Sequence, residues 1–217
     1  CLLVVRKFIL AYMFYREKSS GADTKLLKPP KYGKLTVSGY GLMMKMGFMV
    51  CSGQRMYYST VYPSLIGLLA LASNGEQIVG LWVEGQKYFG SRLGELQEPD
   101  DLPVFNQARQ WLDSYFAGEQ PEVSLVPLAP EGSEFRRVIW QILCDTPSGQ
   151  TTTYGEIARQ MATKMGRFSM SSQAVGGAVG RNPVSIIIPC HRGGGTNGSL
   201  TGYASGLARK IRLLELE

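Results

Sequence analysis

Hydrophobic and polar positions begin to follow a regular pattern just after Met56. Residues 57–62 alternate loosely between the two kinds, and residues 65–73 form a strongly apolar run. Ser73-Asn74-Gly75 is typical of a hairpin turn, and the apolar residues 77–83 follow it closely. The pattern predicts a small antiparallel sheet in this part of the chain.

A helical pattern follows the predicted sheet. Asp101 and Pro103 are typical of a helix start and Gly118 of a helix end. The apolar face between them is formed by Val104, Ala108, Trp111, Leu112 and Tyr115. The proline-rich segment 120–130 predicts a linker, and we place a domain boundary there.

After the linker, the apolar spacing is helical in three successive segments. Ser133 is a suitable N-cap for a first helix, whose apolar positions are Phe135, Val138, Ile139, Ile142 and Leu143. Thr153 and Glu156 predict a capping box over a second helix at 154–161, and residues 171–180 predict a third. Two short helices joined by a turn indicate a helix-turn-helix. The predicted fold is α+β, with an antiparallel sheet domain (56–130) before a mostly helical, winged-helix-like domain (131–217).

The third predicted helix is unusually rich in serine, alanine and glycine. Gly176 and Gly177 each cost about 1 kcal/mol of helix propensity relative to alanine. Two explanations remain open at this point. The helix packs tightly against a neighbour, or its backbone comes close to something bulky such as a DNA groove.

The net charge of +6 is unevenly distributed. Residues 1–55 carry ten Lys and Arg against two acidic residues, residues 56–131 carry three against ten, and residues 132–217 carry ten against five. The net charge alone would suggest a generic polyanion binder, whereas the distribution indicates something narrower, a basic module in the last third behind an acidic one. For the basic extension 1–55, which begins with Cys1, we expect a non-native leader or a disordered segment. A tail for a DNA or membrane surface is the alternative.

Composition excludes several classes of protein. Hydrophobic residues make up 44% and charged residues 18%, which indicates a folded chain. The longest apolar run, Phe8 to Phe14, is too short for a bilayer, which takes ~20 residues, and a signal peptide is a weaker alternative. The four cysteines lie far apart without a CxxC pair, which favours a reduced, cytoplasmic protein. Because His191 is the only histidine, we expect no metal site.

Cys190 is the candidate nucleophile. It follows the apolar run Ile186-Ile187-Ile188, which predicts a buried strand, and it stands beside His191 and Arg192. Cationic neighbours depress the pKa of a thiol, whereas a buried, inert cysteine next to a chance histidine is the plain alternative. Neighbouring side chains of an extended chain point to opposite sides, so we expect a bridging water between Cys190 and His191.

The C-terminal segments complete the candidate site. A glycine-rich loop at 193–198 allows backbone groups to line a pocket. The last predicted helix, 207–217, ends at Glu217, whose carboxylate we expect to point inward and orient an imidazole. The pattern predicts an apolar inner face of Leu207, Ile211 and Leu214 and a basic outer face of Arg209, Lys210 and Arg212.

These motifs resemble those of a known family. Ile188-Pro-Cys-His-Arg192, Asn197-Gly-Ser-Leu-Thr-Gly-Tyr-Ala204 and Gly206-Leu207 resemble the active-site signature of the O6-alkylguanine-DNA alkyltransferases. Thr153-Tyr-Gly-Glu-Ile-Ala158 and Ala174-Val-Gly-Gly-Ala-Val-Gly-Arg-Asn-Pro183 extend the resemblance over the region 56–217. The DNA groove therefore becomes the favoured explanation of the third helix.

The resemblance implies a DNA-repair enzyme that acts once. Cys190, activated through a water held by His191 and oriented by Glu217, would take the alkyl group from guanine O6, with O4-alkylthymine as a further substrate. Tyr154 would hydrogen-bond guanine N3, and Asn182 would steady the turn beneath the nucleophile. The partner is double-stranded DNA, bound in the minor groove with the base flipped out. We expect a cytoplasmic monomer without cofactor, membrane contact or obligate protein partner.

The resemblance also implies the binding residues. Expected DNA contacts are Ser171, Ser172, Gln173, Ala174, Gly176, Gly177, Arg181 and Arg192. Expected pocket residues are Tyr154, Val179, Gly193, Leu200, Tyr203 and Ala204. The chain departs from the family pattern at Gln173, where many members have an arginine that fills the gap left by the flipped base. It departs also at Gly193-Gly194, where β-branched residues are usual, and at Ser205-Gly206-Leu207, where Gly-Gly-Leu is commoner.

Two other functions would use part of the same features, a non-catalytic recogniser of DNA damage and a cysteine hydrolase. A non-catalytic recogniser would use the same helix-turn-helix to flip and flag the lesion, but such members lack the cysteine that is present here. A cysteine hydrolase needs direct contact between thiol and imidazole and an oxyanion hole, and neither the adjacency of Cys190 and His191 nor the basic module suits it.

Overall fold

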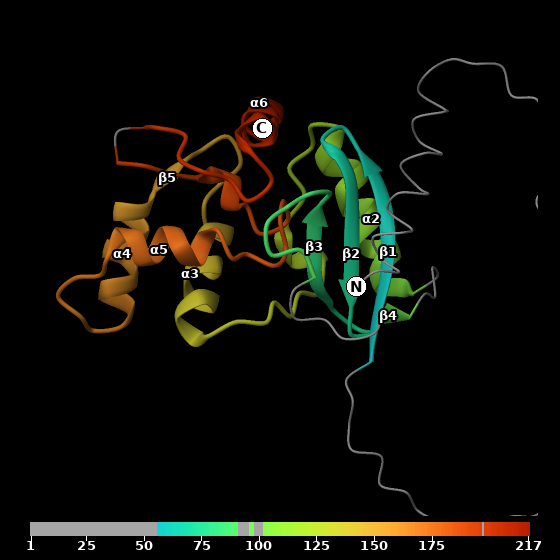
Figure 1. Cartoon of the computed structure of the whole chain (residues 1–217), viewed down its shortest axis with the longest axis horizontal. Coiled ribbons are helices and arrows are strands. Elements are labelled where there is room, and N and C mark those ends of the chain that lie inside the picture. Colours follow the sequence, from blue (N-terminus) through green and yellow to red (C-terminus); the bar gives the residue numbers. More distant parts are fainter. Residues whose placement is uncertain (1–55, 91–95, 98–101, 197) are drawn as a thin grey trace, which may run out of the picture.

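The computed structural model describes residues 56–90, 96–97, 102–196 and 198–217. The expectations for the extension 1–55 and for Asp101 and Asn197 lie outside the described residues. Within the described part, a small sheet with one helix lies beside a group of short helices (Figure 1). The predicted α+β class is confirmed.

The sheet is built from three antiparallel strands, β1 (Tyr57–Ser64), β2 (Gly67–Ser73) and β3 (Ile78–Val83). β2 and β3 are apolar along almost their whole length because both faces of these strands are covered. Gly75, with φ +107°, makes the turn between them, as the Asn-Gly pair predicts. A short fourth strand, β4 (Leu96–Gln97), pairs in parallel with β1 and was not predicted.

One face of the sheet is covered by α2 (Pro103–Phe116), which lies behind the strands in Figure 1. Pro103 stands at the helix start, where its missing N–H costs nothing. All five predicted apolar residues are buried, together with Phe105. The helix was therefore predicted with the correct face, which buries Trp111 and Tyr115 toward the second half of the molecule.

The segment 120–130 is not a free linker. It contains a 3-10 turn, Val123–Leu125, and then runs along the edge of β3. The Ile78 N–H donates to the Pro127 carbonyl at 2.8 Å, and the Ala129 N–H donates to the Ile78 carbonyl at 2.9 Å. The proline content predicts a linker, but proline carbonyls still accept hydrogen bonds, so the segment can pair with a sheet edge.

The second half holds α3 (Glu134–Cys144), α4 (Tyr154–Lys164), α5 (Ser172–Val179) and α6 (Leu207–Leu216), with β5 (Thr152–Thr153) and β6 (Gly193–Gly194) paired in parallel. Thr153 caps α4 by accepting from the Glu156 N–H at 3.1 Å, and Ser171 caps α5 by accepting from the Ala174 N–H at 3.3 Å. α4 and α5 pack together as the predicted helix-turn-helix (Figure 1).

The predicted faces of the last helix are wrong. Leu207 and Ile211 are 45% and 41% exposed, whereas Leu213 and Lys210 are buried. The spacing of the apolar residues predicted the wrong inner face because Lys210 takes an inner position. Two backbone carbonyls accept hydrogen bonds from its ammonium group there. Arg209 is also half-buried.

Hydrogen bonds join the sheet and its helix to the group of short helices that follows. The Leu81 N–H of β3 donates to the Pro183 carbonyl at 2.8 Å, and the Ser185 N–H donates to the Leu81 carbonyl at 2.8 Å. Arg209 of α6 reaches into the sheet domain and donates to the carbonyls of Ile66 at 3.0 Å and Glu84 at 2.7 Å. The turn that carries Cys190 is thus attached directly to the sheet. In the described part of the chain, no helix has the length and apolarity needed to cross a membrane.

Candidate active site

Cys190 lies at the end of a tight buried turn. The run 186–188 is not the predicted strand, because Ile186 has φ +72° and the chain reverses on itself there. The burial of the three isoleucines was correctly inferred, but an apolar run does not distinguish a strand from a buried turn. Residues Cys190–Arg192 form one 3-10 turn, so the premise of an extended chain at Cys190 is also wrong. Side chains one residue apart on such a turn still point about 120° apart.

Asn182 holds this turn together. Its side-chain N–H donates to the carbonyls of Ile188 at 2.8 Å and Val184 at 3.2 Å, and its oxygen accepts from the Val184 N–H at 3.0 Å. Asn182 is 4% exposed, so these bonds are shielded from water. The amide therefore supplies the hydrogen bonds that the irregular backbone before Cys190 cannot make within itself.

His191 is fully buried and lies against Glu217. Its Nε2 is 2.7 Å from Glu217 Oε1. Arg192 binds the same carboxylate at two points, with Nε donating to Oε2 at 2.9 Å and Nη2 donating to Oε1 at 2.9 Å. Burial raises the pKa of Glu217, but hydrogen bonds and charge from His191 and Arg192 outweigh it and lower this pKa to about 2. Glu217 is therefore an ionised acceptor at neutral pH.

An ionised acceptor at Nε2 fixes the tautomer of His191, since Nε2 then carries the hydrogen. Burial lowers the pKa of His191, and the opposing effect of Glu217 does not restore it, so the ring is neutral at neutral pH. The other nitrogen, Nδ1, is buried and has no hydrogen-bond partner among the described residues. Its lone pair is available to accept a proton, directly or through a water.

The thiol of Cys190 differs from the sequence expectation. Burial raises its pKa, and the opposing effects of Asn182, Tyr203 and the Lys210 charge do not cancel that rise. Cys190 is 5% exposed, and its guanidinium neighbour, Arg192, is neutralised by Glu217. The predicted depression of the pKa by adjacent cations is therefore wrong. The thiol needs a base to become a nucleophile, and His191 Nδ1 is the base that the site offers.

Lys210 was not predicted as part of the site. It is 1% exposed, and its Nζ donates to the carbonyls of Gly193 at 2.6 Å and Thr201 at 3.1 Å. Burial lowers the pKa of Lys210. The ammonium group ties Gly193, at the start of the glycine-rich loop, and Thr201, beyond its end, to α6, and it places a positive charge near Cys190. The sequence analysis placed Lys210 on the outer face of this helix, and the structure corrects that prediction.

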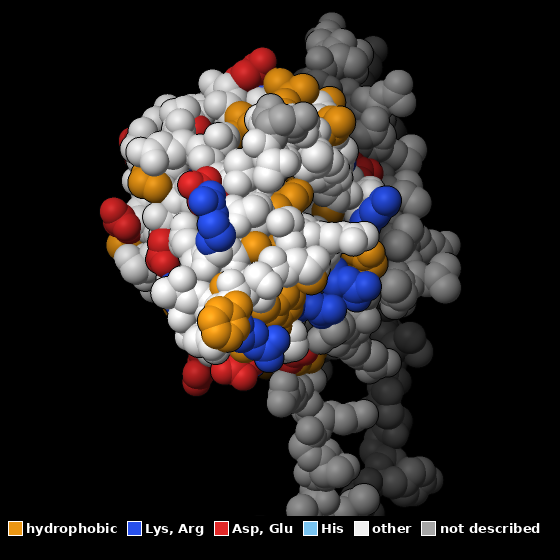
Figure 2. All heavy atoms as spheres, turned by 90° about the vertical axis from the view of Figure 1, so that its left-hand side faces the viewer, with side chains coloured by type: hydrophobic (Ala, Val, Ile, Leu, Met, Phe, Trp, Pro, Cys, Tyr) orange, Lys and Arg blue, Asp and Glu red, His pale blue; other side chains and the backbone are white. Residues whose placement is uncertain are grey.

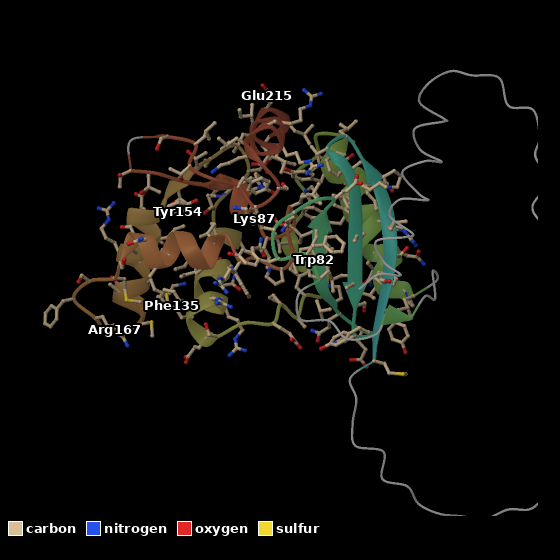
Figure 3. All side chains as sticks on the ribbon, viewed as in Figure 1. Trp82, Lys87, Phe135, Tyr154, Arg167 and Glu215 are labelled. Atoms are coloured by element: carbon tan, nitrogen blue, oxygen red, sulfur yellow. The ribbon has the colours of Figure 1, made fainter. Side chains whose placement is uncertain are left out.

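Tyr154 lies at the start of α4, and its ring packs in space between Gly176 of α5 and Gly193 of β6. A Cβ atom at Gly176 would come within 3.3 Å of its ring, and one at Gly193 within 3.2 Å. The position of Tyr154 on the helix-turn-helix side of the molecule is seen in Figure 3. Gly176 is therefore explained by packing on Tyr154. This is the tight packing against a neighbouring helix that the sequence left open as one explanation of the small residues. Gly177 has open space around its Cβ position.

The other expected pocket residues lie on the loop after Cys190 and on α5. Gly193 and Val179 are buried, Tyr203 and Ala204 are half-buried, and Leu200 is 41% exposed. Gly193 directly follows the Cys190 turn and pairs with Thr152. Tyr203 lies close enough to Cys190 to influence the pKa of the thiol.

The outer face of α5 carries the expected DNA contacts. Ser171, Ser172, Gln173, Ala174 and Gly177 are all exposed, while Val175, Ala178 and Val179 are buried. Gln173 is the one long side chain of this exposed set. Figure 2 shows this end of the molecule, a largely uncharged surface with Lys and Arg side chains on it and Asp and Glu side chains toward its left-hand and lower edges. Arg181 is exposed and stacks on Tyr88, with its guanidinium carbon 5.1 Å from the ring centre.

Arg192 is not placed for DNA contact. It is 9% exposed, and its guanidinium group is occupied by Glu217 and by the Thr146 carbonyl. The expectation that Arg192 contacts DNA is therefore corrected, because its guanidinium group is buried against Glu217 and Thr146. The sequence also gave no indication of Thr146 or of Tyr115, whose hydroxyl donates to Glu217 Oε1 at 2.9 Å.

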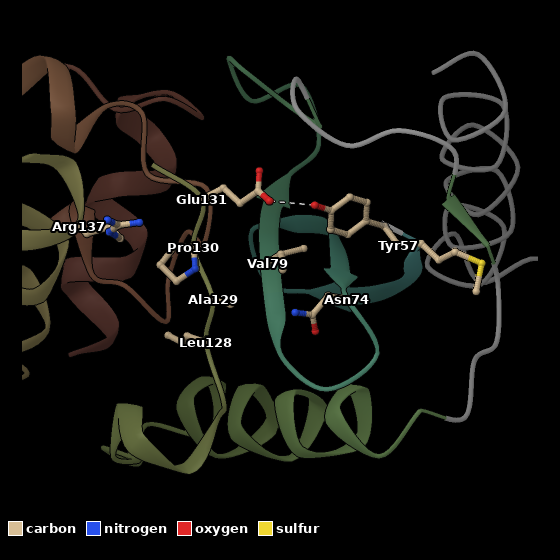
Figure 4. A pocket seen from close by; sticks show the side chains of 9 residues that line it. Tyr57, Asn74, Val79, Leu128, Ala129, Pro130, Glu131 and Arg137 are labelled. Carbon is tan, nitrogen blue, oxygen red and sulfur yellow. Dashed lines mark hydrogen bonds between the residues drawn. The ribbon is translucent and has the colours of Figure 1, made fainter. Parts of the chain in front are cut away.

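A pocket of about 590 Å³ lies elsewhere, between β3 and the segment 128–131 (Figure 4). The Tyr57 hydroxyl donates to Glu131 Oε1 at 2.8 Å across it. None of its lining residues belongs to the group around Cys190. Among the described residues, no group of His, Cys, Asp and Glu could hold a metal ion.

Fold and site together define a protein in which a helix-turn-helix lies beside a buried thiol, imidazole and carboxylate. Residues 56–130 match the domain described as 6-O-methylguanine DNA methyltransferase, ribonuclease-like domain, and residues 134–217 match its DNA binding domain. The chain belongs to the 6-O-methylguanine DNA methyltransferase family.

Individual relatives agree with this assignment. A methylated-DNA–protein-cysteine methyltransferase of Haemophilus influenzae is 43% identical over 160 residues, which cover 74% of this chain and 86% of the relative. One from Mycobacterium leprae is 44% identical over 154 residues, covering 71% and 88%. The crystal structure of Mycobacterium tuberculosis OGT in complex with DNA superimposes with a TM-score of 0.62 at 38% identity, covering 74% of this chain and 91% of that one.

Proposed function

We propose that this protein repairs DNA by moving the alkyl group of O6-alkylguanine onto its own Cys190. The observation that carries the proposal is the group formed by a buried thiol, the neutral imidazole of the next residue with a free nitrogen, and an ionised carboxylate that fixes that imidazole. The names of the relatives, methylated-DNA–protein-cysteine methyltransferases, support the same chemistry.

The reaction balances with the groups of this chain alone. His191 Nδ1 accepts the thiol proton through a water, and the sulfur attacks the alkyl carbon in line. A carbon–sulfur bond forms as the bond between that carbon and guanine O6 breaks. The electron pair of the broken bond stays on the guanine, which takes up the proton, and the Tyr154 hydroxyl at guanine N3 helps it to leave neutral. No cofactor enters this balance, and the stable thioether makes the protein act once.

Binding of DNA is assigned to the exposed face of α5. Small side chains there let the helix backbone approach the minor groove, while Gln173 occupies the space of the flipped base. Leu200, Tyr203 and Ala204 would form the guanine pocket together with the Gly193 backbone. We further propose that residues 56–130 and 131–217 are the two domains, that the protein is a monomer, and that it works in the cytoplasm, where chromosomal substrate and a reduced thiol coexist.

Mass spectrometry tests the proposal directly. The full chain is incubated with a duplex oligonucleotide that contains one O6-methylguanine, and the peptides are then weighed. The expected result is one added CH2 group on the Cys190 peptide and none in the Cys190→Ser variant. Cys144→Ser is the matched control, because burial raises the pKa of Cys144 to about 11 and this thiol has no imidazole beside it. An adduct on Cys144 would show that Cys190 is not the nucleophile. DNA binding that is retained without any adduct would indicate a non-catalytic recogniser.

A further inference from the structure

Tyr115 belongs to α2 of the sheet domain, yet its hydroxyl lies within the His191–Glu217 pair. The hydroxyl donates to Glu217 Oε1 at 2.9 Å, and its oxygen is 3.4 Å from His191 Nε2. Tyr115 is 4% exposed, and its ring stacks on Trp111 with centroids 5.3 Å apart. The Trp111 indole in turn donates to the Glu122 carbonyl at 3.0 Å. The hydroxyl is therefore held in place from the side of the sheet domain.

Glu217 Oε1 accepts three hydrogen bonds, from His191 Nε2, Arg192 Nη2 and the Tyr115 hydroxyl. Each donor withdraws negative charge from this oxygen and so weakens its attraction for the others. Tyr115 stays neutral as a donor, because burial and then the charge of Glu217 raise its pKa. The hydroxyl thus competes with His191 for the same oxygen while also fixing where that oxygen lies.

We propose that Tyr115 is a positioning residue for the transfer reaction, through which the sheet domain holds Glu217 in place and keeps His191 free to accept the Cys190 proton. The role rests on the proposed function. The charged and titratable groups around His191 come from three elements: Glu217 and Lys210 near or on α6, Cys190 and Arg192 on its own turn, and Tyr115 on α2.

The sign of the effect separates this role from simple packing. Without the Tyr115 hydroxyl, Glu217 remains ionised because Arg192 still binds it, but its Oε1 becomes a stronger acceptor. A stronger acceptor at Nε2 stabilises protonated His191, so the pKa of His191 rises. Loss of the carboxylate itself, in Glu217→Gln, lowers that pKa. The two variants therefore shift His191 in opposite directions, which mere loosening of the site does not produce.

The single histidine makes the measurement direct, because all ring ¹⁵N signals of a histidine-labelled full chain belong to His191. In Tyr115→Phe we expect the titration of His191 to move to higher pH, with Nε2 still protonated in the neutral ring. The acid limb of the transfer rate should move to higher pH by the same amount. Tyr62→Phe is the matched control, since Tyr62 donates to Asp113 of the same helix at 2.6 Å without facing His191.

Site-specific 3-fluorotyrosine at position 115 keeps the shape of the side chain and makes its hydroxyl a stronger donor. It should move the His191 titration to lower pH, and it answers the question even if Tyr115→Phe does not fold. An unchanged His191 titration in both variants, or a shift to lower pH in Tyr115→Phe, overturns the proposal. The spectra do not depend on transfer, so a wild-type chain that fails to alkylate Cys190 refutes the proposed function separately.

Discussion

Arg192 and Glu217 form a buried ion pair with two parallel hydrogen bonds, both 2.9 Å long. The pair joins the 3-10 turn of the nucleophile to the end of α6, so two segments far apart in sequence are fixed at the point where the proton must move. An arginine is suited to this place, because only a planar guanidinium can bind both carboxylate oxygens at once.

Replacing Arg192 by lysine should therefore destabilise the protein rather than weaken its hold on DNA. Lysine keeps the charge but loses the fork and the bond to the Thr146 carbonyl, which we expect to cost about 2 to 4 kcal/mol of unfolding free energy. Urea unfolding and a salt-dependent DNA-binding titration would be measured together. Unchanged stability with a large loss of DNA affinity would restore Arg192 to the DNA-binding set.

Acid should weaken the fold through Glu217. The pKa of this carboxyl is lowered from 4.5 to about 2, so its contribution to stability is complete above pH 4.5 and is lost as the pH falls toward 2. In Glu217→Gln this contribution is missing at every pH. The difference in unfolding free energy between wild type and variant, measured by urea unfolding, should shrink as the pH is lowered from 5 to 2. A constant difference would mean that Glu217 is not ionised through this pair.

Changing Asn182 to aspartate should affect both stability and chemistry. Aspartate keeps the size and the acceptor toward the Val184 N–H, but it loses the two donations to the Ile188 and Val184 carbonyls, which should cost about 2 to 4 kcal/mol. Its negative charge beside the thiol should raise the pKa of Cys190 further and move the transfer rate toward higher pH. Asn182→Ala, which loses the bonds without adding a charge, is the comparison. Equal pH profiles in the two variants would exclude the electrostatic part.

Gln173 should matter only when a base has to leave the duplex. Flipping costs a few kcal/mol of stacking and pairing, and a long side chain on the exposed face of α5 can fill the space left behind. Gln173→Arg should speed repair of duplex DNA by a modest factor, since a guanidinium offers a planar, charged contact with the orphaned base. Gln173→Ala should slow it. Neither change should alter reaction with free O6-benzylguanine.

Second-order inactivation rates of both Gln173 variants on both substrates provide the check. Equal effects on duplex and free base would mean that Gln173 shapes the pocket or the fold. Ser172→Ala is a suitable control, because it changes the same exposed face without removing a long side chain.

The sequence predicted those parts of the molecule where local pattern and final environment agree. The antiparallel strands, the buried face of α2 and the Thr153 cap follow from alternation, helical spacing and side-chain hydrogen bonding within a few residues. The segment 186–188 failed because apolar composition reports burial and not backbone direction.

The network around Cys190 depends on contacts that no local pattern contains. Lys210 lies inward because the carbonyls of Gly193 and Thr201 accept hydrogen bonds from its ammonium group, and Tyr115 of α2 reaches Glu217 from 102 positions away. The expected depression of the Cys190 pKa failed for the same reason, since only the fold decides that Arg192 is already paired and that the thiol is dehydrated. The sequence motifs identified Cys190, His191 and Glu217 as the reacting groups but did not predict their ionisation states.

The hydrogen bonds along β3 bear on how the chain avoids aggregation. One half of this strand pairs with the segment after α2 through Pro127 and Ala129, and the other half pairs with Pro183 and Ser185 of the second domain. An uncovered strand edge is a template for pairing with other chains. Separation of the two domains would bare half of an almost wholly apolar strand. The turn that positions the nucleophile therefore also seals the sheet, and loss of active-site structure and onset of self-association should occur together during unfolding.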